Sequence, residues 1–351
     1  MEPLRLGIVG SGAVSELLHL PSLLSSESFT LSAVCDPALD RAQRLAAKFN
    51  IPHVVSHHNE LAGLVDAALV ATPNHLHAQV ACDLLKQGIH VNVEKIMALT
   101  TADAQAIVEA AATSDRVLTV GLEFRFFTQM RFVRQLLALG LLGDIERCDI
   151  RLGVVLKWPV KSDYLMKRAA AGGGVLTDFG PHILDLVLWW LGDWATVEYA
   201  DDALGGIEAN ATINLRMATG AAVAIEMSRN RVLRNSVIIT GSNGRLEVGL
   251  WDPLAPVRLE LHGETVQLEG QCTWPSHGAP PKPQTFHGAV ARQWTDMAGA
   301  IREHRQPFVT GVDGVRHVRL IEACYAKRTS LRYEWEELPA SDVESKLTFS
   351  A

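Results

Sequence analysis

The segment over residues 172–192 carries two residues that could transfer a proton, Asp178 and His182. They lie four residues apart after three consecutive glycines, and Pro181 opens the apolar run that Gly192 closes. Proline favours the first turn of a helix and glycine the position just past its end, so the sequence predicts a helix over 181–191. An imidazole has an ordinary pKa near about 6.5, so it can take up or release a proton at neutral pH. His182 is therefore a candidate acid or base, with Asp178 in the turn before it.

The surroundings of this helix allow two interpretations. Its residues are apolar on nearly every side, so the helix should be buried, and His182 and Asp185 form its only polar stripe. The helix N-terminus should disfavour the imidazolium form of His182, whereas the Asp178 carboxylate should favour it. In the alternative interpretation, Asp178 and Asp185 cap the helix and His182 is a core histidine without a chemical role.

A second candidate group, Lys95, lies in the first third of the chain, where predicted strands and helices alternate. Such alternation predicts a parallel sheet with helices on both faces. The predicted strands cover 4–9, 29–35, 67–71, 90–93 and 117–121, and the predicted helices cover 13–24, 77–87 and 102–112. Ligands bind beyond the carboxyl ends of such strands, so one rim should hold Gly10, Asp36, Thr72, Glu94 and Lys95. Lys95 then faces a pocket; taken alone, it could instead be a solvated lysine in a surface turn.

The first predicted strand ends in Gly10-Ser11-Gly12 and leads into a helix, which is the context of a dinucleotide-binding loop. Gly10 permits a tight turn, and Gly12 lets backbone amides approach a pyrophosphate where Ala13 and Val14 open the helix. The alternative is that the two glycines form a tight turn and nothing more.

The second predicted strand ends at Asp36, which bears on the choice of cofactor. Its carboxylate could accept hydrogen bonds from an adenosine ribose and would repel a 2′-phosphate. The sequence therefore favours NAD, while Arg41 and Arg44 lie close enough along the chain to leave NADP possible.

Beyond residue 123 the pattern changes to long alternating stretches, which predict a large open mixed or antiparallel sheet. Its strands are expected over 145–156, 196–203, 206–217, 221–229, 236–240, 245–250, 257–261 and 331–335, with helices over 125–139, 289–303 and 314–327. The fold class is thus α/β followed by α+β. The 351 residues suit two domains, placed at 1–123 for dinucleotide binding and at 124–351 for substrate binding and oligomerisation. A broad sheet with helices on one side leaves its other face open, so we expect a homodimer or homotetramer through that face.

The overall composition excludes several classes of function. A formal charge of −7 argues against a nucleic-acid or anionic-membrane surface, and no apolar run is long enough to span a bilayer. Five scattered cysteines without a CxxC pair fit reduced thiols in the cytoplasm, where we expect the protein. His53, His57 and His58 stand in a polar loop without a supporting carboxylate or cysteine pattern, so no metal site is expected. The segment 276–284 is the nearest candidate for a linker.

Taken in order, several motifs resemble those of the Gfo/Idh/MocA oxidoreductases, a family named for glucose–fructose oxidoreductase and inositol dehydrogenase. The motifs are GSGAVSELLHLPSL, ATPNHLH, Glu94-Lys95 after a strand, GLEFRF and GGGVLTDFGPHILDLVLWWLG. The resemblance runs from residue 4 to about residue 335. It implies an N-terminal Rossmann domain, a C-terminal domain with an open sheet, a nicotinamide cofactor, and reversible oxidation of a hydroxyl on a sugar or cyclitol.

The resemblance also implies roles for individual residues. Lys95 matches the lysine of the family's Glu-Lys-Pro motif, which contacts both the substrate hydroxyl and the cofactor, although Ile96 replaces the proline. Asp178 and His182 match the family's D-x-G-x-H-x-x-D signature, in which the histidine accepts or donates the proton. The loop that lines the cofactor is matched by Thr72, Pro73, Asn74 and His77.

Outside these motifs, the candidate substrate contacts are Arg125, Trp158 and Tyr164, followed by Lys157, Lys167, Arg168, Arg229 and Arg231. The leading hypothesis is an NAD(P)-dependent dehydrogenase or reductase that acts on a sugar or polyol. Two further hypotheses stay open. Some family members cleave glycosides through transient oxidation by bound NAD, and others are non-catalytic regulators that bind a dinucleotide.

Overall fold

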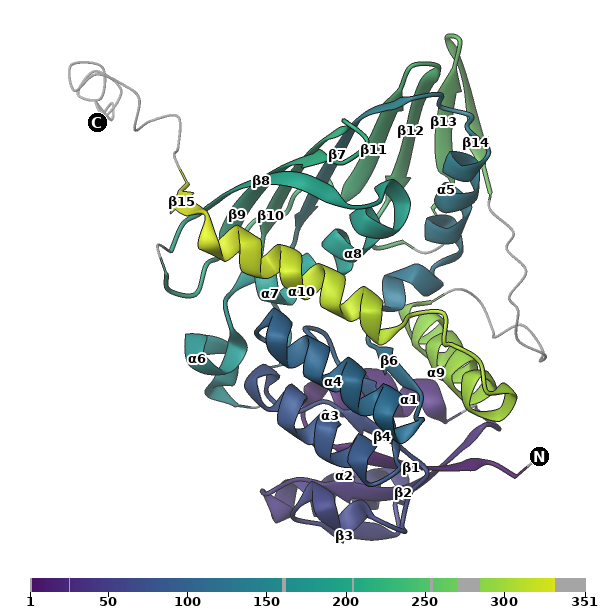
Figure 1. Ribbon diagram of the computed structural model, residues 1–351, viewed down its shortest axis with the longest axis vertical. Helices are drawn as coiled ribbons and strands as arrows, with labels where there is room; N and C mark the ends of the chain where they lie inside the picture. Colours follow the sequence, from purple (N-terminus) through teal and green to yellow (C-terminus); the bar gives the residue numbers. More distant parts are fainter. Residues whose placement is uncertain are drawn as a thin grey trace, which may run out of the picture.

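Two β-sheets lie at opposite ends of the molecule, with helices packed between and around them (Figure 1). The computed structural model describes residues 2–24, 26–159, 162–203, 205–252, 255–269 and 285–331. The sheet built from the first third of the chain has six strands, and the second sheet has nine. This arrangement confirms the predicted fold class, an α/β unit combined with a large open sheet.

The first sheet is parallel throughout and has the strand order β3-β2-β1-β4-β5-β6. Its strands are β1 (Leu4–Val9), β2 (Phe29–Cys35), β3 (His53–Val55), β4 (Ala67–Val70), β5 (His90–Val93) and β6 (Leu118–Val120). The strand order reverses between β1 and β4, and in such sheets the crevice outside the carboxyl ends at this point is where ligands bind. The prediction that His53 lies in a loop is wrong, because a three-residue strand at a sheet edge leaves too short a pattern to recognise.

Short and long helices connect these strands. They are η1 (Ser15–His19), α1 (Leu20–Leu23), α2 (Leu39–Phe49), η2 (His58–Leu61), η3 (Asn74–Leu76), α3 (His77–Lys86) and α4 (Thr101–Ser114). The longer ones are amphipathic: α2, for example, buries Ala42, Leu45 and Ala46, which share one helix face.

The helix after the glycine loop changes its winding before Pro21. Residues 13–23 are helical, but Ser15–His19 forms a π-helical segment. Pro21 has no N–H and its ring displaces the carbonyl four residues earlier, that of Leu17. His287 Nε2 donates to this Leu17 carbonyl at 2.9 Å, so a side chain from the far end of the chain replaces the lost helical hydrogen bond.

The second sheet is mixed, with the strand order β14-β13-β12-β11-β7-β10-β9-β8-β15. The pairs β7–β10 and β8–β15 are parallel, and the other neighbours are antiparallel. Its strands are β7 (Ile145–Gly153), β8 (Trp194–Asp201), β9 (Asn210–Met217), β10 (Ala222–Ser228), β11 (Ser236–Gly241), β12 (Gly244–Gly249), β13 (Val257–Leu261), β14 (Glu264–Leu268) and β15 (Arg328–Ser330). The sequence predicts seven of these nine strands. The exceptions are β14, whose side chains are mostly exposed and carry little alternation, and β15, which ends before the strand predicted over 331–335.

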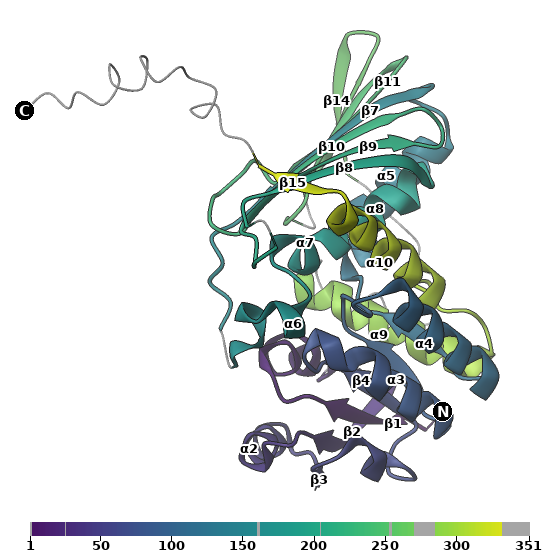
Figure 2. The same cartoon turned by 60° about the vertical axis from the view of Figure 1, so that its left-hand side comes forward.

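The two faces of this sheet differ in polarity. On β7, Cys148, Ile150 and Leu152 are buried, whereas Arg147 and Arg151, which point to the other face, are exposed. Figure 2 shows α8 (Gly180–Leu191) and α10 (Gly311–Ala326) on one side of the sheet. The opposite, polar side has no helix of the described chain over it in either view.

The remaining helices join the two sheets. They are η4 (Glu123–Phe126), α5 (Thr128–Ala138), η5 (Asp163–Met166), α6 (Arg168–Ala171), α7 (Val175–Asp178) and α9 (Phe286–Glu303). The predicted helix over 125–139 is divided, because Phe127 adopts an extended conformation between η4 and α5. The single turns η5, α6 and α7 are not predicted, since one turn has no repeat that a sequence pattern can reveal.

Helix α9 follows the second sheet in the sequence but packs against the first. Its Trp294 is fully buried in a cluster with Leu6, Leu20 and Phe29. The figures agree, since α9 lies beside the first sheet in both views. The chain therefore returns to the first sheet after residue 285. The division into two domains at residue 123 stays a prediction.

Several expectations fall at the edges of the described chain. The predicted strand over 331–335 lies mostly outside the described residues, and β15 ends just before it. The linker candidate 276–284 also lies outside them.

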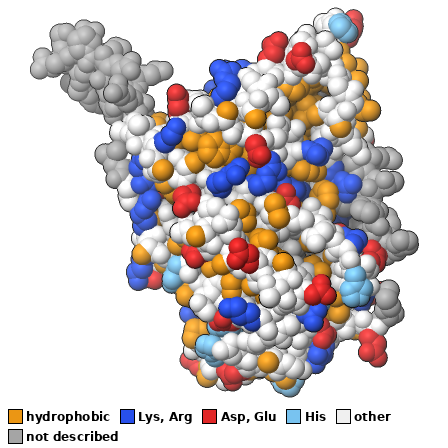
Figure 3. Space-filling model, viewed as in Figure 1, with side chains coloured by type: hydrophobic (Ala, Val, Ile, Leu, Met, Phe, Trp, Pro, Cys, Tyr) orange, Lys and Arg blue, Asp and Glu red, His pale blue; other side chains and the backbone are white. Residues whose placement is uncertain are grey.

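Within the described part, no helix is both long and apolar enough to cross a membrane, and no group of His, Cys, Asp or Glu residues could hold a metal ion. On the face shown in Figure 3, acidic and basic side chains are interspersed.

We expect Gly10→Ala to lower the free energy of unfolding by about 2 kcal/mol or more in urea denaturation. Gly10 has a φ of 101°, and a Cβ there would collide with the Ala71 carbonyl. The matched control is Gly12→Ala, since Gly12 lacks a positive φ and a Cβ there would meet no atom within 4 Å. Its unfolding free energy should change by less than about 0.5 kcal/mol. Equal losses in the two variants would contradict this account of the loop.

Candidate active site

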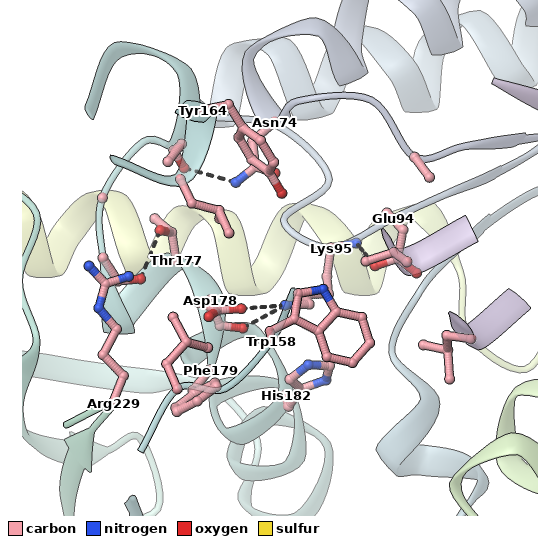
Figure 4. Close-up of a pocket in the computed structure, with 18 of the residues that line it drawn as sticks. Asn74, Glu94, Lys95, Trp158, Tyr164, Thr177, Asp178, Phe179, His182 and Arg229 are labelled. Atoms are coloured by element: carbon pink, nitrogen blue, oxygen red, sulfur yellow. Dashed lines mark hydrogen bonds and ion pairs between the residues drawn. The ribbon is translucent and has the colours of Figure 1, made fainter. Parts of the chain in front are cut away.

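A cavity of about 520 Å³ opens beyond the carboxyl ends of β4 and β5 and reaches the start of α8. Two segments far apart in the chain meet in its wall, namely the residues after β4 and β5 and the stretch from the end of α7 to the start of α8 (Figure 4). The first segment contributes Thr72, Asn74, His77, Glu94 and Lys95, and the second contributes Thr177, Asp178, Phe179 and His182. The structure therefore brings Lys95, Asp178 and His182 to one cavity.

An ion pair joins the two walls of this cavity. Lys95 Nζ donates to Asp178 Oδ1 at 3.0 Å and to the Asp178 backbone carbonyl at 2.8 Å (Figure 4). Burial disfavours the ammonium, but the charges of Asp178 and Glu94 outweigh burial and raise the pKa of Lys95. Lys95 is thus a charged residue of the cavity wall and not a solvated surface lysine. The peptide bond between Lys95 and Ile96 is cis.

Glu94, next to Lys95, is held by a chain of buried hydrogen bonds. Trp294 Nε1 donates to His19 Nδ1 at 3.1 Å, and His19 Nε2 lies 2.7 Å from Glu94 Oε1. Because an indole N–H can only donate, His19 Nδ1 accepts, so the ring carries its proton on Nε2 and donates it in a hydrogen bond to Glu94. Burial raises the pKa of Glu94, but the His19 hydrogen bond and the Lys95 charge outweigh it, and the pKa lies below its ordinary value. Gly121 leaves room for this carboxylate, since a Cβ there would lie 2.7 Å from Glu94 Oε1.

His182 lies in an apolar setting with one carboxyl neighbour. Its ring stacks on Phe124 with the centroids 4.7 Å apart, and its Nδ1 lies 3.5 Å from Glu123 Oε1. Burial, with the Lys95 charge and His317 acting in the same direction, lowers the pKa of His182 well below its ordinary value. The expectation that Asp178 favours the imidazolium is wrong, because the Asp178 carboxylate binds Lys95. The carboxyl group closest to the ring belongs to a residue that the sequence analysis did not select.

That residue, Glu123, follows β6 and is only 5 % exposed. Burial, together with the nearby charge of Glu94, raises the pKa of Glu123 to about 8, so the group is mostly protonated at neutral pH. One signal was available in the sequence: Glu123 is an acidic residue within the apolar and aromatic stretch GLEFRF. The sequence does not show that this stretch folds against His182.

Arg125 does not belong to the cavity, which corrects its assignment as a substrate contact. It is 3 % exposed, and its guanidinium binds both carboxylate oxygens of Asp185 at 2.6 and 2.7 Å and Asp313 at 2.9 Å. A fork held by two carboxylates cannot also reach a ligand. Arg125 therefore fixes η4 between α8 and α10.

The interpretation in which Asp178 and Asp185 cap the helix is also wrong. The N-cap of α8 is Phe179 and makes no side-chain capping hydrogen bond. Asp178 binds Lys95 and Asp185 binds Arg125, so both carboxylates are used for long-range ion pairs.

The predicted dinucleotide loop forms a compact turn at the tips of β1 and β2. The Gly10 amide donates to the Cys35 carbonyl at 2.9 Å. Asp36 Oδ2 accepts from the Ser11 amide at 2.9 Å and from its hydroxyl at 2.6 Å, and Oδ1 accepts from the Ala38 amide. Space beside Gly12 is open, at the N-terminus of the helix over 13–23. An open glycine next to a helix N-terminus suits a phosphate group, so the residues fit a dinucleotide.

The loop after β4 connects the dinucleotide side of the cavity to the second half of the chain. Asn74 Nδ2 donates to the Ala171 carbonyl at 2.8 Å. The buried His77 ring lies between the Thr72 and Ile96 carbonyls, at 2.9 and 2.8 Å, so it braces the loop. Asn74, His77 and Val14 line the cavity, whereas Gly10, Gly12, Ala13, Asp36 and Pro73 are not among its lining residues.

Trp158 and Tyr164, the other two predicted substrate contacts, do line the cavity, as do Lys157 and Arg229. Burial raises the pKa of the Tyr164 hydroxyl, which therefore stays protonated as a hydrogen-bond donor. Aromatic and apolar side chains complete this part of the wall, among them Phe179, Trp251 and Phe286.

The three glycines before α7 are anchored by the buried Glu208, which the sequence analysis did not single out. Glu208 Oε1 accepts from the amides of Gly174 and Leu176 at 2.8 and 3.1 Å and from the Tyr325 hydroxyl at 2.7 Å. A side chain at Gly173 or Gly174 would collide with Tyr325 or with the Glu208 backbone. The glycines therefore permit the close packing that places Asp178.

Two protein-family models match this chain, one in its first part and one in its second. Residues 4–122 match the family described as an oxidoreductase family with an NAD-binding Rossmann fold, and residues 130–247 match the GFO/IDH/MocA C-terminal domain. A D-glucoside 3-dehydrogenase of Escherichia coli (strain K12) is 32 % identical over 54 % of this chain and 54 % of its own length. The chain thus spans about half the length of that relative.

Two other proteins match over nearly the whole chain. The rhizopine catabolism protein MocA of Rhizobium meliloti is 25 % identical over 92 % of this chain and 94 % of its own length. The structure of aldose-aldose oxidoreductase from Caulobacter crescentus, complexed with glycerol, superposes with a TM-score of 0.80 at 25 % identity, covering 93 % of this chain and 97 % of that one.

We expect the stability of the protein to depend on pH through Glu123. A raised carboxyl pKa means that the folded state binds the proton more tightly, so this stabilisation is complete below the unfolded pKa of about 4.3 and is lost as pH rises through about 8. Glu123→Gln cannot ionise, so between about pH 5 and pH 9 its unfolding free energy should rise relative to wild type by up to about 4 kcal/mol.

Chemical denaturation at several pH values measures this difference. The control is Glu146→Gln, the same change at an exposed position of β7. Its stability should run parallel to that of wild type at every pH. A parallel curve for Glu123→Gln would show that the Glu123 carboxyl does not have the raised pKa.

Proposed function

The chain belongs to the Gfo/Idh/MocA family of oxidoreductases, and we propose that it transfers hydride between NAD and a hydroxyl-bearing carbon of a sugar, sugar derivative or cyclitol. The observation that carries this proposal is the meeting of Lys95 and His182 in one cavity, beside the loop that fits a dinucleotide. When bound, the nicotinamide supplies the hydride acceptor or donor, and the protein supplies placement and proton transfer.

The residues proposed to hold the dinucleotide come from the carboxyl ends of the first sheet. The backbone at Gly10, Gly12, Ala13 and Val14 would face the phosphates. Asp36 would accept hydrogen bonds from the adenosine ribose. Toward the nicotinamide, the proposed contacts are Thr72, Pro73, Asn74, His77, Glu94 and Lys95.

The reacting oxygen would lie between Lys95 and His182. An ammonium has three protons, and two of those on Lys95 point to Asp178, which leaves one for the substrate oxygen. This N–H of Lys95 would stabilise the negative charge that develops on the substrate oxygen as the hydroxyl proton leaves. His182, neutral because burial lowers its pKa, would take the proton in oxidation and return it in reduction. Asp178 would orient Lys95.

The other lining residues support a substrate with both hydroxyl groups and an apolar ring face. Trp158 and Phe179 offer flat apolar surfaces, and Tyr164 offers a hydroxyl. A mostly apolar pocket with a few polar groups is typical of sites for small ligands. The names of the relatives point the same way, since one is a D-glucoside dehydrogenase and another an aldose-aldose oxidoreductase.

The proposal includes assembly into a homodimer or homotetramer through the open face of the nine-stranded sheet. That face carries Arg147 and Arg151 on β7 and is not covered by a helix of the described chain. A symmetric partner would cover it.

Replacing Lys95 by Met or His182 by Asn should lower turnover by about 10²- to 10⁴-fold. In His182→Asn, which changes no proposed cofactor contact, the affinity for NADH should change by less than about threefold. Lys86→Met, at an exposed lysine of α3, is the control for the loss of one ammonium and should leave both quantities unchanged. NADH binding is followed by fluorescence, and net NAD reduction is followed with a panel of sugars, glycosides and cyclitols.

The outcomes separate the hypotheses. Protein that does not change NADH fluorescence at millimolar concentrations would refute the cofactor assignment. Glycoside cleavage without net NADH formation would indicate the glycosidase-type reaction. Binding of NADH with no turnover on the whole panel would favour a regulator.

We expect NADH to bind at least about tenfold more tightly than NADPH, because the Asp36 carboxylate would repel a 2′-phosphate. Asp36→Asn keeps a polar side chain at the tip of β2 but removes the charge, so the ratio of the two dissociation constants should shrink. Asp40→Asn, at an exposed position of α2 four residues further along the chain, removes the same charge and should leave the ratio nearly unchanged. Preference for NADPH in the wild type would overturn the assignment.

A further inference from the structure

The proposed reaction leaves one buried polar group of the cavity wall unused, the carboxyl of Glu123. Its Oε1 lies 3.5 Å from His182 Nδ1, slightly beyond hydrogen-bond distance, and both side chains are at least nine-tenths buried. His182 Nδ1 is buried and has no hydrogen-bond partner among the described residues. Hydrogen bonds of catalytic groups are often long before a ligand binds and shorten afterwards.

The orientation of the ring makes this pairing specific. His182 stacks on Phe124 at an interplanar angle of 21°, and Phe124 also contacts Phe127 and Trp251. A ring held in such a stack keeps Nδ1 toward Glu123. The nitrogen on the other side of the ring, Nε2, is then the one available to a ligand in the cavity that His182 lines.

We propose that Glu123 is the proton partner of His182, a positioning residue that sets which ring nitrogen carries the proton and thereby whether His182 acts as an acid or a base. The role of Glu123 in catalysis rests on the proposed function, whereas its pairing with His182 does not.

The protonation state of Glu123 selects between two forms of the pair. As a carboxylic acid, Glu123 donates to Nδ1, the neutral imidazole carries its proton on Nε2, and His182 is ready to donate. As a carboxylate, Glu123 accepts from Nδ1–H, and the Nε2 lone pair is ready to accept. The two forms differ by one proton and leave the imidazole neutral in both.

In oxidation, two protons and one hydride move. The substrate hydroxyl gives its proton to Nε2 as the N–H bond forms there, and the Nδ1 proton moves to Glu123 Oε1. The hydride of the carbon would go to the nicotinamide, which supplies that chemistry when it is bound. Glu123 ends as a carboxylic acid and His182 ends neutral, so no imidazolium accumulates beside Lys95. Reduction of the carbonyl reverses each transfer.

The neighbouring charges explain why such a relay is useful here. Burial, with Lys95 and His317, opposes a positive charge on His182. Around Glu123, burial and Glu94 disfavour the carboxylate, Lys95 at the end of β5 favours it, and Asp185 on α8 disfavours it. The other charged groups on the elements packed against η4 have partners of their own: Arg125 holds Asp185 and Asp313, and Arg292 on α9 donates to the Phe126 carbonyl. The balance puts the pKa of Glu123 at about 8, where small changes in pH switch the pair.

The direct test is ¹⁵N NMR of the His182 ring in the protein without cofactor, with His182→Asn used to assign its signals. In wild type, we expect the neutral ring to change from the Nε2–H to the Nδ1–H form with a midpoint near pH 8. In Glu123→Gln, which cannot ionise, the ring should keep one form from about pH 6 to pH 10. Glu146→Gln should behave as wild type. Ring signals that do not change with pH in wild type, or that change equally in Glu123→Gln, would overturn the proposal.

Steady-state kinetics test whether Glu123 affects catalysis through His182. For oxidation, kcat/KM in wild type should rise through an apparent pKa near 8, and this rise should vanish in Glu123→Gln while kcat falls about 10- to 100-fold and KM changes less than about threefold. Glu123→Asp should restore part of the pH-dependent rise. Unchanged kcat and pH profile in Glu123→Gln would refute the relay even if the ring shows the NMR change. Because the NMR experiment uses no substrate or cofactor, its result does not depend on the proposed function.

Discussion

The ion pair between Lys95 and Asp178 fixes the geometry on which the rest of the cavity depends. It joins the end of β5 to the turn before α8, two segments separated by 83 residues. A buried charge is costly when its partner is removed, so each group constrains the position of the other. The supporting contacts serve the same end: Glu208 anchors the glycines before Asp178, and His19 holds Glu94 next to Lys95.

The charges around the cavity are balanced unevenly, and this unevenness gives the site its chemistry. Asp178 is paired with Lys95, Asp185 is paired with Arg125, and Glu94 accepts a hydrogen bond from His19. Glu123 has no hydrogen-bonded cation among the described residues, so its carboxyl is the one whose pKa rises to about 8. The result is a cavity lined by the Lys95 ammonium and by a neutral imidazole that lies beside a carboxyl of raised pKa.

Much of the fold could be predicted from the sequence. Strands β1, β2 and β5 agree with the prediction residue for residue, because each is a short apolar run between clear turn signals. Helix α8 begins one residue before the predicted Pro181, since proline and glycine mark its ends. Elements of one turn, such as η5 and α7, could not be predicted, because one turn is too short to show a helical repeat. Strand β14 could not be predicted because its side chains are mostly exposed and show no alternation.

The sequence by itself determined which residues carry reactive groups and that Lys95, Asp178 and His182 stand at the ends of predicted elements. Only the tertiary structure decided how they pair: Asp178 meets Lys95 and not His182, Arg125 is taken by two aspartates, and Glu123 lies beside the imidazole. The physical reason is that helix and strand patterns depend on neighbours within about four residues, whereas each of these pairs spans about 60 residues or more and forms only when the two sheets pack through their shared helices. Burial is likewise a property of that packing, and it is burial that keeps His182 neutral and raises the pKa of Glu123.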